Sequence, residues 1–129
     1  MHVELDDNMK ITNVQEVFNS LFPFLKIEFF EQEIKINGSI ATRRHISNGN
    51  RKLGEFRNRT KASNNISIFP NLTVSELEHN FVTIYALQSQ VFRKSGKVWL
   101  ETTVTDSWTL EEQNRQGELI TAQMNLNRV

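Results

Sequence analysis

Residues 11–22 carry apolar side chains at the spacing of an amphipathic α-helix. Thr12 with Gln15 resembles a capping box at its start, and Pro23 would end the helix. The apolar side chains share one face of this expected helix: Ile11, Val14, Phe18, Leu21 and Phe22.

Residues 24–31 alternate between apolar and charged side chains. Leu25, Ile27 and Phe29 point to one side, and Lys26 and Glu28 to the other. This pattern predicts a strand with one buried face, which residues 33–37 either extend or pair against. If the edge of residues 24–31 is bare, it could pair with a second copy of the chain, which makes a homodimer possible.

A second strand and helix follow at residues 66–85. Residues 66–69 predict a short strand that ends at a Pro-Asn pair. The next helix starts at a capping box formed either by Thr73 with Glu76 or by Ser75 with Glu78. Its inward stripe is expected to be Leu77, Phe81 and Ile84, with Val74 and Tyr85 at the margins.

Residues 88–104 predict a β-hairpin. A turn at Ser95-Gly96 places Phe92 opposite Trp99. One face is apolar and is expected to face the core: Leu87, Val91, Val98, Leu100 and Val104. The other face holds the Phe–Trp pair among polar neighbours: Gln90, Lys94, Lys97 and Glu101.

The remaining segments carry weaker patterns. Residues 107–119 predict one helical turn followed by irregular chain, anchored by Trp108 and Leu110, with Asp106 as an N-cap or turn residue. Residues 1–10 predict a polar lead-in that can fray. Residues 37–65 predict a long basic loop with one short strand or helical turn at 52–57.

The order of these elements predicts an α+β fold in one domain over residues 1–129. Two strands, a helix and two more strands suggest a small mixed sheet with helices on one face. The stretch ISIFPNLTVSELEHNF and the late DSWTLEEQN resemble a β-grasp (ubiquitin-like) fold, and a ferredoxin-like arrangement is the alternative.

Three longer stretches are similar to segments of a family of small uncharacterised bacterial proteins of the Bacteroidetes type. They are LFPFLKIEFF, TVSELE and QVFRKSGKVWLETTVTDSWTLEEQN. The resemblance implies a small cytoplasmic protein, with no known activity and no catalytic residue to carry over.

Composition narrows the possible chemistry. The chain has no cysteine, which excludes disulfides, thiolate nucleophiles and cysteine-based metal sites and suits a reducing compartment. No apolar run is long enough to span a membrane, and the N-terminus shows no signal-peptide pattern. These features predict a cytoplasmic protein without membrane contact.

No motif for catalysis, metal binding or nucleotide binding stands out. The three histidines, His2, His45 and His79, lack metal-ligand spacing, and no GxSxG or phosphate loop occurs. Glu111 and Glu112 are adjacent and would point in different directions on a helix, so they suit a first helical turn. We therefore expect no cofactor and no enzyme activity; the alternative is an enzyme whose site is assembled from scattered polar residues.

Two surfaces remain as candidate contacts. The charge is uneven: residues 43–61 hold seven Lys or Arg and one Glu, although the formal net charge of the chain is zero. A weak nucleic-acid binder would use this segment through Arg43, Arg44, Arg51, Lys52, Arg57, Arg59 and Lys61. A protein-binding module, the first hypothesis, would use Phe92, Arg93, Lys94, Lys97 and Trp99. The competing structural interpretation is that Trp99 braces a covered hairpin and Trp108 plugs one end of the core.

Overall fold

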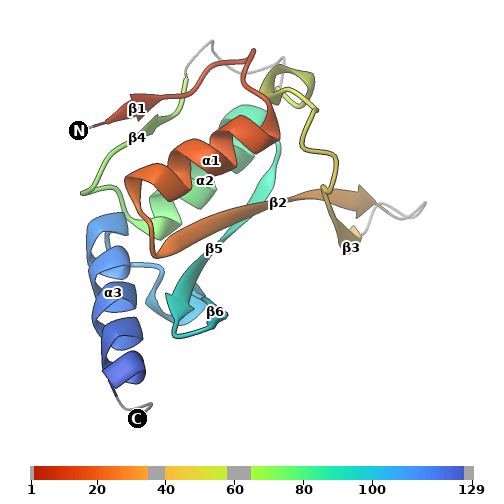
Figure 1. The fold of residues 1–129 in the computed structure, drawn as a ribbon. Helices are drawn as coiled ribbons and strands as arrows, with labels where there is room; N and C mark the ends of the chain where they lie inside the picture. The colour runs from red at the N-terminus through yellow and green to blue at the C-terminus, as the bar shows by residue number, and fades with distance from the viewer. Residues whose placement is uncertain (1, 35–39, 58–64, 127–129) are drawn as a thin grey trace.

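A computed structural model describes residues 2–34, 40–57 and 65–126. Its elements are drawn in Figure 1. In chain order they are β1 (Val3–Glu4), α1 (Ile11–Leu21), β2 (Leu25–Ile34), β3 (Ile40–His45), the 3-10 turn η1 (Leu53–Glu55), β4 (Ser67–Ile68), α2 (Val74–Tyr85), β5 (Gln88–Ser95), β6 (Val98–Glu101), the 3-10 turn η2 (Thr103–Thr105) and α3 (Leu110–Leu126).

The main sheet has four strands in the order β3-β2-β5-β6, and every neighbouring pair is antiparallel. The N-terminal strand β1 instead pairs with β4 in a separate two-stranded ribbon. The predicted α+β class is therefore confirmed, whereas the main sheet is not mixed and the β-grasp order is not confirmed.

β5 pairs with Leu25–Phe30 of β2, but β3 pairs only with Phe30–Ile34, so no described strand lies along the other edge of residues 25–29. Side chains of α1 cover part of this edge, where Gln15 and Asn19 donate to the carbonyl oxygens of Ile27 and Leu25. Pairing with a second copy at this edge stays a prediction.

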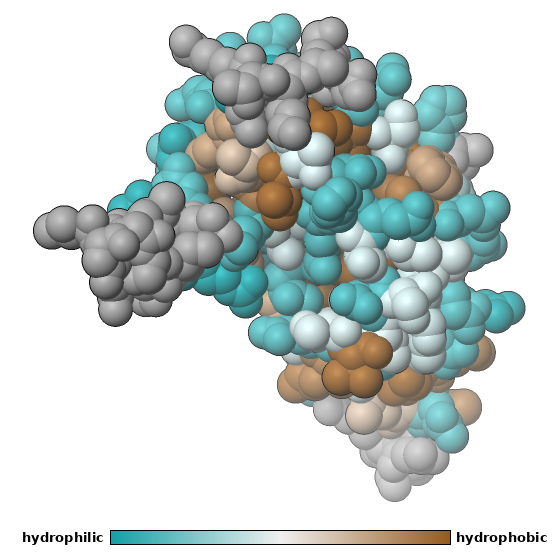
Figure 2. All heavy atoms as spheres, turned by 180° about the vertical axis from the view of Figure 1, so that it is seen from behind, coloured by the Kyte–Doolittle hydropathy of each residue, from teal (hydrophilic) through white to brown (hydrophobic). Residues whose placement is uncertain are grey.

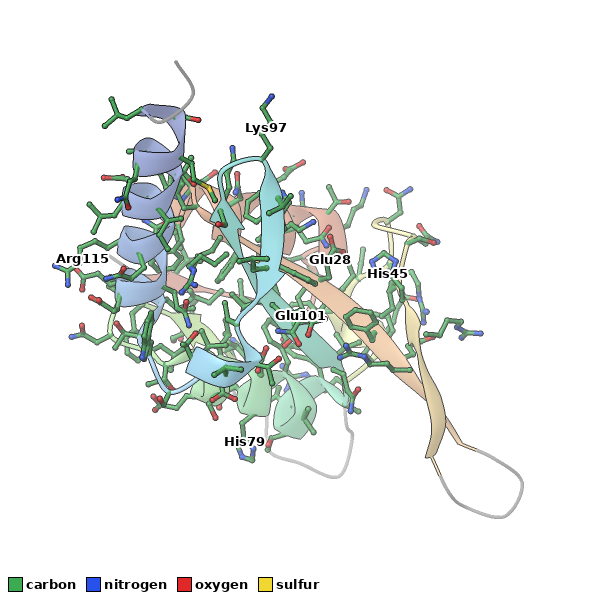
Figure 3. The ribbon with its side chains drawn as sticks, turned by 90° about the horizontal axis from the view of Figure 1, so that it is seen from below. Glu28, His45, His79, Lys97, Glu101 and Arg115 are labelled. Atoms are coloured by element: carbon green, nitrogen blue, oxygen red, sulfur yellow. The ribbon has the colours of Figure 1, made fainter. Side chains whose placement is uncertain are left out.

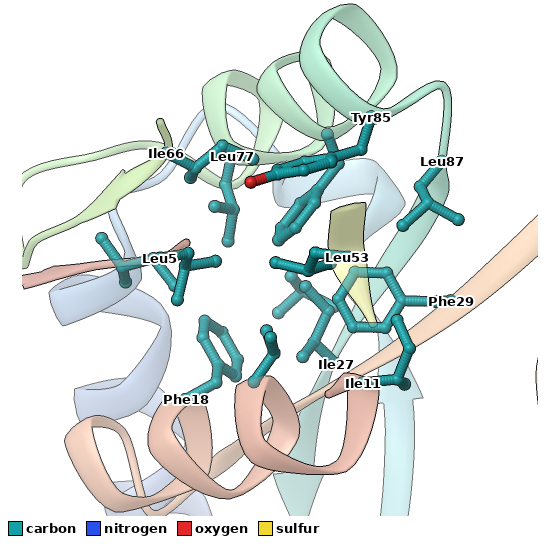
Figure 4. Close-up of a cluster of buried hydrophobic side chains, with 14 of the residues drawn as sticks. Leu5, Ile11, Phe18, Ile27, Phe29, Leu53, Ile66, Leu77, Tyr85 and Leu87 are labelled. Carbon is teal, nitrogen blue, oxygen red and sulfur yellow. The ribbon is translucent and has the colours of Figure 1, made fainter. Parts of the chain in front are cut away.

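All three helices lie on one face of this sheet. The ring centroids of Phe29 on β2 and Phe81 on α2 are 4.9 Å apart, and α1 contributes Val14 and Phe18 to the same buried cluster (Figure 4). α3 lies farther along this face, where Gln113 accepts a hydrogen bond from Arg93. The opposite face carries no helix in the part of the chain that the structure describes.

The first two helices begin as local chemistry dictates. At α2, Thr73 Oγ1 accepts the backbone N–H of Glu76, and the Glu76 carboxylate accepts that of Thr73, which confirms the first of the two predicted capping boxes. α1 begins after Lys10, not at Thr12, and the Asn13 side chain accepts the Lys10 N–H. The predicted capping box of Thr12 with Gln15 is therefore wrong: Asn13, two residues before Gln15, is the side chain that accepts the N–H of the residue preceding the helix.

Two predicted irregular segments hold ordered structure. Residues 40–45, predicted as part of the long basic loop, form strand β3. The 3-10 turn at residues 53–55 matches the short strand or helical turn predicted at residues 52–57. Near the N-terminus, Leu5 is fully buried. Asp7 accepts two short hydrogen bonds from Arg57, 2.8 and 2.6 Å long. These long-range contacts, with the pairing of Val3 and Glu4 to β4, join residues 3–10 to the rest of the fold; fraying of the N-terminus stays a prediction.

α3 is a full helix where only one turn was predicted. Its buried positions are Leu110, Gln113, Gly117 and Thr121. Gln113 is satisfied by Thr105 and Arg93, and Gly117 allows close approach to Phe24. Thr109 accepts the first-turn N–H of Glu112, so Asp106 is not the N-cap and instead lies in a turn, the other predicted alternative. The helix escaped sequence reasoning because its inward face is polar or small rather than apolar.

The hairpin turn lies one residue later than predicted. Ser95 pairs with Val98 and Lys94 with Trp99, so Gly96 and Lys97 form the turn, and Gly96 has the positive φ of 67° that favours glycine there. The two faces keep their membership, because a shift of this kind preserves the alternation. The expected core positions on β6 are nevertheless exposed, with Val98 56% and Leu100 45% accessible, since α3 packs on β5 and leaves β6 at the edge. Val104, which lies in η2, is exposed as well.

Among the described residues, no helix has the length and apolar character needed to cross a bilayer.

Candidate functional site

The face of the main sheet opposite the helices, here called the open face, is the best candidate for a contact surface. Strand alternation and the pairing registers assign the members of this face. They are Lys26, Glu28 and Phe30 of β2, Arg43 and His45 of β3, Gln88, Gln90, Phe92 and Lys94 of β5, and Trp99 and Glu101 of β6.

Aromatic rings and cations alternate across this face. Lys26 Nζ lies 5.2 Å from the ring centroids of both Phe92 and Trp99. On the other side of β2, the guanidinium carbon of Arg43 lies 4.2 Å from the Phe30 ring. Each such contact is worth about 0.5–1 kcal/mol at a partly exposed site. The three rings are half-buried, and each has a cationic side chain packed beside it.

A histidine–carboxylate pair occupies the β3 side of the open face. His45 Nε2 lies 2.8 Å from the Glu28 carboxylate, and Figure 3 shows the two side chains next to each other. The His45 ring also meets Phe30 edge-on, with centroids 5.5 Å apart. Gln15 of α1 reaches the strand edge from behind and donates to the Ile27 carbonyl oxygen. Gln15 Nε2 also donates to Glu28 Oε2 at 3.3 Å. The His45–Glu28 pair is therefore in contact with both Gln15 and Phe30 and forms a polar part of the open face.

The mixture of side chains gives the open face little net charge. Lys26, Arg43 and Lys94 are its cations, and Glu28 and Glu101 are its carboxylates. With Phe30, Phe92 and Trp99 beside these charges, the open face combines apolar contact area with charges of both signs, which is typical of protein-binding sites. Seen from behind, the surface of the molecule is mostly teal and white with separate brown patches (Figure 2).

The structure separates the residues predicted for partner binding. Phe92, Lys94 and Trp99 lie together on the open face. Arg93 points to the helix side, where it donates to Gln113 at 3.0 Å and lies 5.7 Å from the Trp108 ring centroid. Lys97 lies at the exposed hairpin tip and points away from the sheet (Figure 3).

Sequence reasoning missed part of this surface. Lys26 was placed on the polar side of its strand, but nothing local showed that it would lie beside Phe92 and Trp99. That proximity depends on the pairing of β2 with β5, which are far apart in the sequence. The only available signal was the alternation within residues 24–31, which marks a polar face without showing its neighbours.

The two tryptophans do not have the structural roles proposed for them. Trp99 lies on the open face, where no described helix covers it, so the interpretation as a covered brace is wrong. Trp108 is 37% exposed and covers Arg93 instead of plugging the core. Leu110, the other predicted anchor, is fully buried as expected.

The basic segment 43–61 does not form one patch. Arg44 and Arg51 both donate to the Glu31 carboxylate, at 2.8 and 2.9 Å, and these bonds lower the Glu31 pKa. Arg57 pairs with Asp7, and Lys52 is exposed. Arg59 and Lys61 lie outside the described residues. Of the Lys and Arg residues of this segment that the structure describes, Arg43 is the one that belongs to the open face.

Within the described ranges, no group of three or more His, Asp or Glu side chains is arranged to hold a metal ion. Comparisons with protein-family models, with curated proteins and with solved structures found no match. The resemblance to the small bacterial family accordingly stays a prediction.

Proposed function

We propose that this chain is a non-enzymatic interaction module whose open face binds another protein. The observation that carries the proposal is the pair of rings Phe92 and Trp99 around Lys26, with Phe30 farther along the same sheet face, which no described helix covers. Aromatic side chains beside cations are enriched among residues that dominate protein interfaces. A cytoplasmic setting, which the cysteine-free composition suits, belongs to the same proposal.

The partner is expected to present apolar side chains beside carboxylates. Lys26 and Lys94 flank Trp99, and Lys26 lies between two rings, so an approaching carboxylate would meet a cation already positioned by aromatic contacts. Such charge complementarity raises the rate of association and fixes orientation. Glu28 is close by: its Oε2 lies 2.8 Å from His45 Nε2 and its Oε1 lies 4.0 Å from Lys26 Nζ, so a partner carboxylate would share Lys26 with Glu28.

Single-stranded nucleic acid is the second candidate. Aromatic rings on an antiparallel sheet are the platform on which bases stack, and Arg43 over Phe30 fits that chemistry. The carboxylates of Glu28 and Glu101 would repel phosphates on the same face, however, and Arg44, Arg51 and Arg57 are engaged with acids. These charges favour a protein partner.

The test uses the two tryptophans as a matched pair. Nuclease-treated lysate is passed over wild type, Trp99→Ser and Trp108→Ser, and captured proteins are identified by mass spectrometry. A captured protein is then purified and titrated against the Trp108→Phe variant, in which Trp99 is the only tryptophan. We expect saturable change in Trp99 fluorescence, at least tenfold weaker binding to Trp99→Ser, and near wild-type binding to Trp108→Ser.

Two results would contradict the proposal. If a purified partner bound wild type and Trp99→Ser equally, the open face would not be its binding site. If only single-stranded RNA or DNA homopolymers perturbed Trp99, with affinity that falls steeply with salt and is lost in Arg43→Glu, the module would bind nucleic acid instead. Acid-to-amide changes on the partner's surface distinguish charge pairing from apolar contact alone.

A further inference from the structure

A polar hollow lies at the edge of β5, just beyond the end of β6. The last β5–β6 pair is Phe92 with Glu101, after which Thr102 donates its N–H and hydroxyl to the Val91 carbonyl oxygen. Hydrogen-bonding direction alternates along an antiparallel ladder, so Ser89, like Val91, directs its backbone polar groups to this edge. No strand continues opposite Ser89 in the described chain.

At this unpaired edge of β5, the side chain of Glu78 on α2 accepts a backbone N–H that a neighbouring strand would otherwise bind. Its Oε2 accepts the Val91 N–H at 3.2 Å. Burial raises the pKa of Glu78 to about 7, although the bond from Val91 works in the opposite direction. Two charged groups face it from other elements: Asp106, after η2, raises the pKa further, and Arg43 of β3 lowers it. The carboxylate is thus only partly compensated when it is ionised.

The hollow beside Glu78 has a volume of about 230 Å³. Its lining comes from α2, β3, β5 and η2 and consists of Arg43, Glu78, Val82, Gln88, Ser89, Gln90 and Thr103. Ser89 is 8% exposed, and its hydroxyl has no hydrogen-bond partner among the described residues. A buried hydroxyl without a partner is uncommon and costs free energy, so it marks a place where a ligand atom would be stabilised.

We propose that this hollow binds a primary ammonium group of the kind carried by a lysine side chain. An ammonium group has three N–H donors and no acceptor. The hollow offers the Glu78 carboxylate, the Ser89 hydroxyl and the amide oxygens of Gln88 or Gln90 as acceptors. Val82 supplies an apolar wall for the alkyl chain. The site borders the open face and shares Arg43, Gln88 and Gln90 with it, but it does not depend on the proposed function of that face.

The charges decide against an anionic ligand. Glu78 and Asp106 both act on the site, and the single cation, Arg43, lies over the Phe30 ring. A bound ammonium would stabilise the ionised carboxylate, so binding should release a proton below pH 7 and strengthen as the pH rises. Val91 holds the carboxylate in place in either protonation state through its N–H.

The probe is Nα-acetyl-lysine methylamide, followed by amide NMR shifts of Ser89 and Val91 between pH 6 and pH 8. If the probe binds only the ionised carboxylate, its apparent affinity should rise about tenfold over this range, because the ionised fraction rises by that factor around a pKa near 7. The matched neutral probe, Nα-acetyl-norleucine methylamide, should not bind. Ser89→Ala should weaken the lysine probe several-fold without changing the pH slope.

Glu78→Gln should abolish binding, whereas Glu118→Gln, an exposed change on α3, should leave it intact. If Glu78→Gln fails to fold, the ¹³C-detected pKa of the Glu78 carboxyl in wild type replaces it, and saturating probe should lower that pKa. Absence of saturable shifts at Ser89 and Val91, equal binding of the norleucine probe, or affinity independent of pH would each overturn the proposal.

Discussion

The change Glu78→Gln should make stability less dependent on pH. Glu78 has a pKa of about 7 in the folded protein, raised from its ordinary value of 4.5 by burial. In the unfolded chain the carboxyl ionises near its ordinary value, so between these two values the folded state binds the extra proton. The contribution of Glu78 to stability should therefore be highest below the unfolded pKa, fall as the pH rises through this window, and level off above pH 7.

The size of the effect follows from the shift. The full difference between the two pKa values corresponds to about 3 kcal/mol of unfolding free energy. Part of the Glu78 carboxyl remains in contact with solvent, so we reduce the expected loss to about 1–2 kcal/mol. Glutamine keeps an oxygen to accept the Val91 N–H and cannot ionise. Relative to wild type, Glu78→Gln should gain about 1–2 kcal/mol between pH 4.5 and pH 8.

Urea unfolding at pH 4.5, 6, 7 and 8 measures this difference. Other carboxylates, such as Asp7 and Glu31, titrate equally in both proteins and cancel in the comparison. Glu118 is exposed, so the difference in unfolding free energy between wild type and Glu118→Gln should stay constant over this pH range. The reasoning would be refuted if wild type and Glu78→Gln differed by a constant amount over this range, or if wild type gained stability relative to the variant as the pH rose.

Three further changes test the fold. Asp7→Asn should cost about 1 kcal/mol at pH 7, since the pair with Arg57 is partly exposed. Because Arg57 lowers the Asp7 pKa from 3.8, this cost should shrink as the pH falls below 3.8; urea unfolding at pH 7 and pH 2.5 should show a smaller cost at the lower pH. Gly117→Ala should lower the urea midpoint despite better helix propensity, because its Cβ would lie 2.9 Å from the Phe24 Cβ and cost about 1–3 kcal/mol; an unchanged midpoint would contradict this. Phe81→Ala should cost about 3–5 kcal/mol in the same assay, whereas its exposed neighbour Val82→Ala should cost little.

Local patterns determined what could be predicted from the sequence. α2 was predicted from its capping box and its apolar stripe, both of which are encoded within a few residues. α3 was not, because polar Gln113 and Thr121 and small Gly117 occupy its buried positions, where Arg93, Gly96 and Phe24 are their partners. β3 was missed because, as an edge strand, it carries Arg43, Arg44 and His45 rather than an apolar alternation.

The candidate site shows the same division. The polar faces of β2 and the hairpin were separately readable, and Phe92 with Trp99 was placed on one face despite an incorrect turn. The assembly of these faces into one surface required the β2–β5 ladder, which no local pattern specifies. The Glu78 hollow was invisible for the same reason, since its lining comes from α2, β3, β5 and η2.

The position of β2 also has a consequence for the order of folding. The β2–β5 ladder joins Leu25 to Arg93 and Phe30 to Gln88, so the two central strands meet only after a long loop has closed. Local hairpins form in about 1–10 μs, whereas folds dominated by distant pairings need about milliseconds to seconds. During synthesis, α1 is available to cover part of Leu25, Ile27 and Phe29, but β2 has no β5 to pair with until residues 88–95 have been made. We expect a chain truncated before β5 to expose these residues and aggregate, so the last third of the sequence decides when the first third becomes structured.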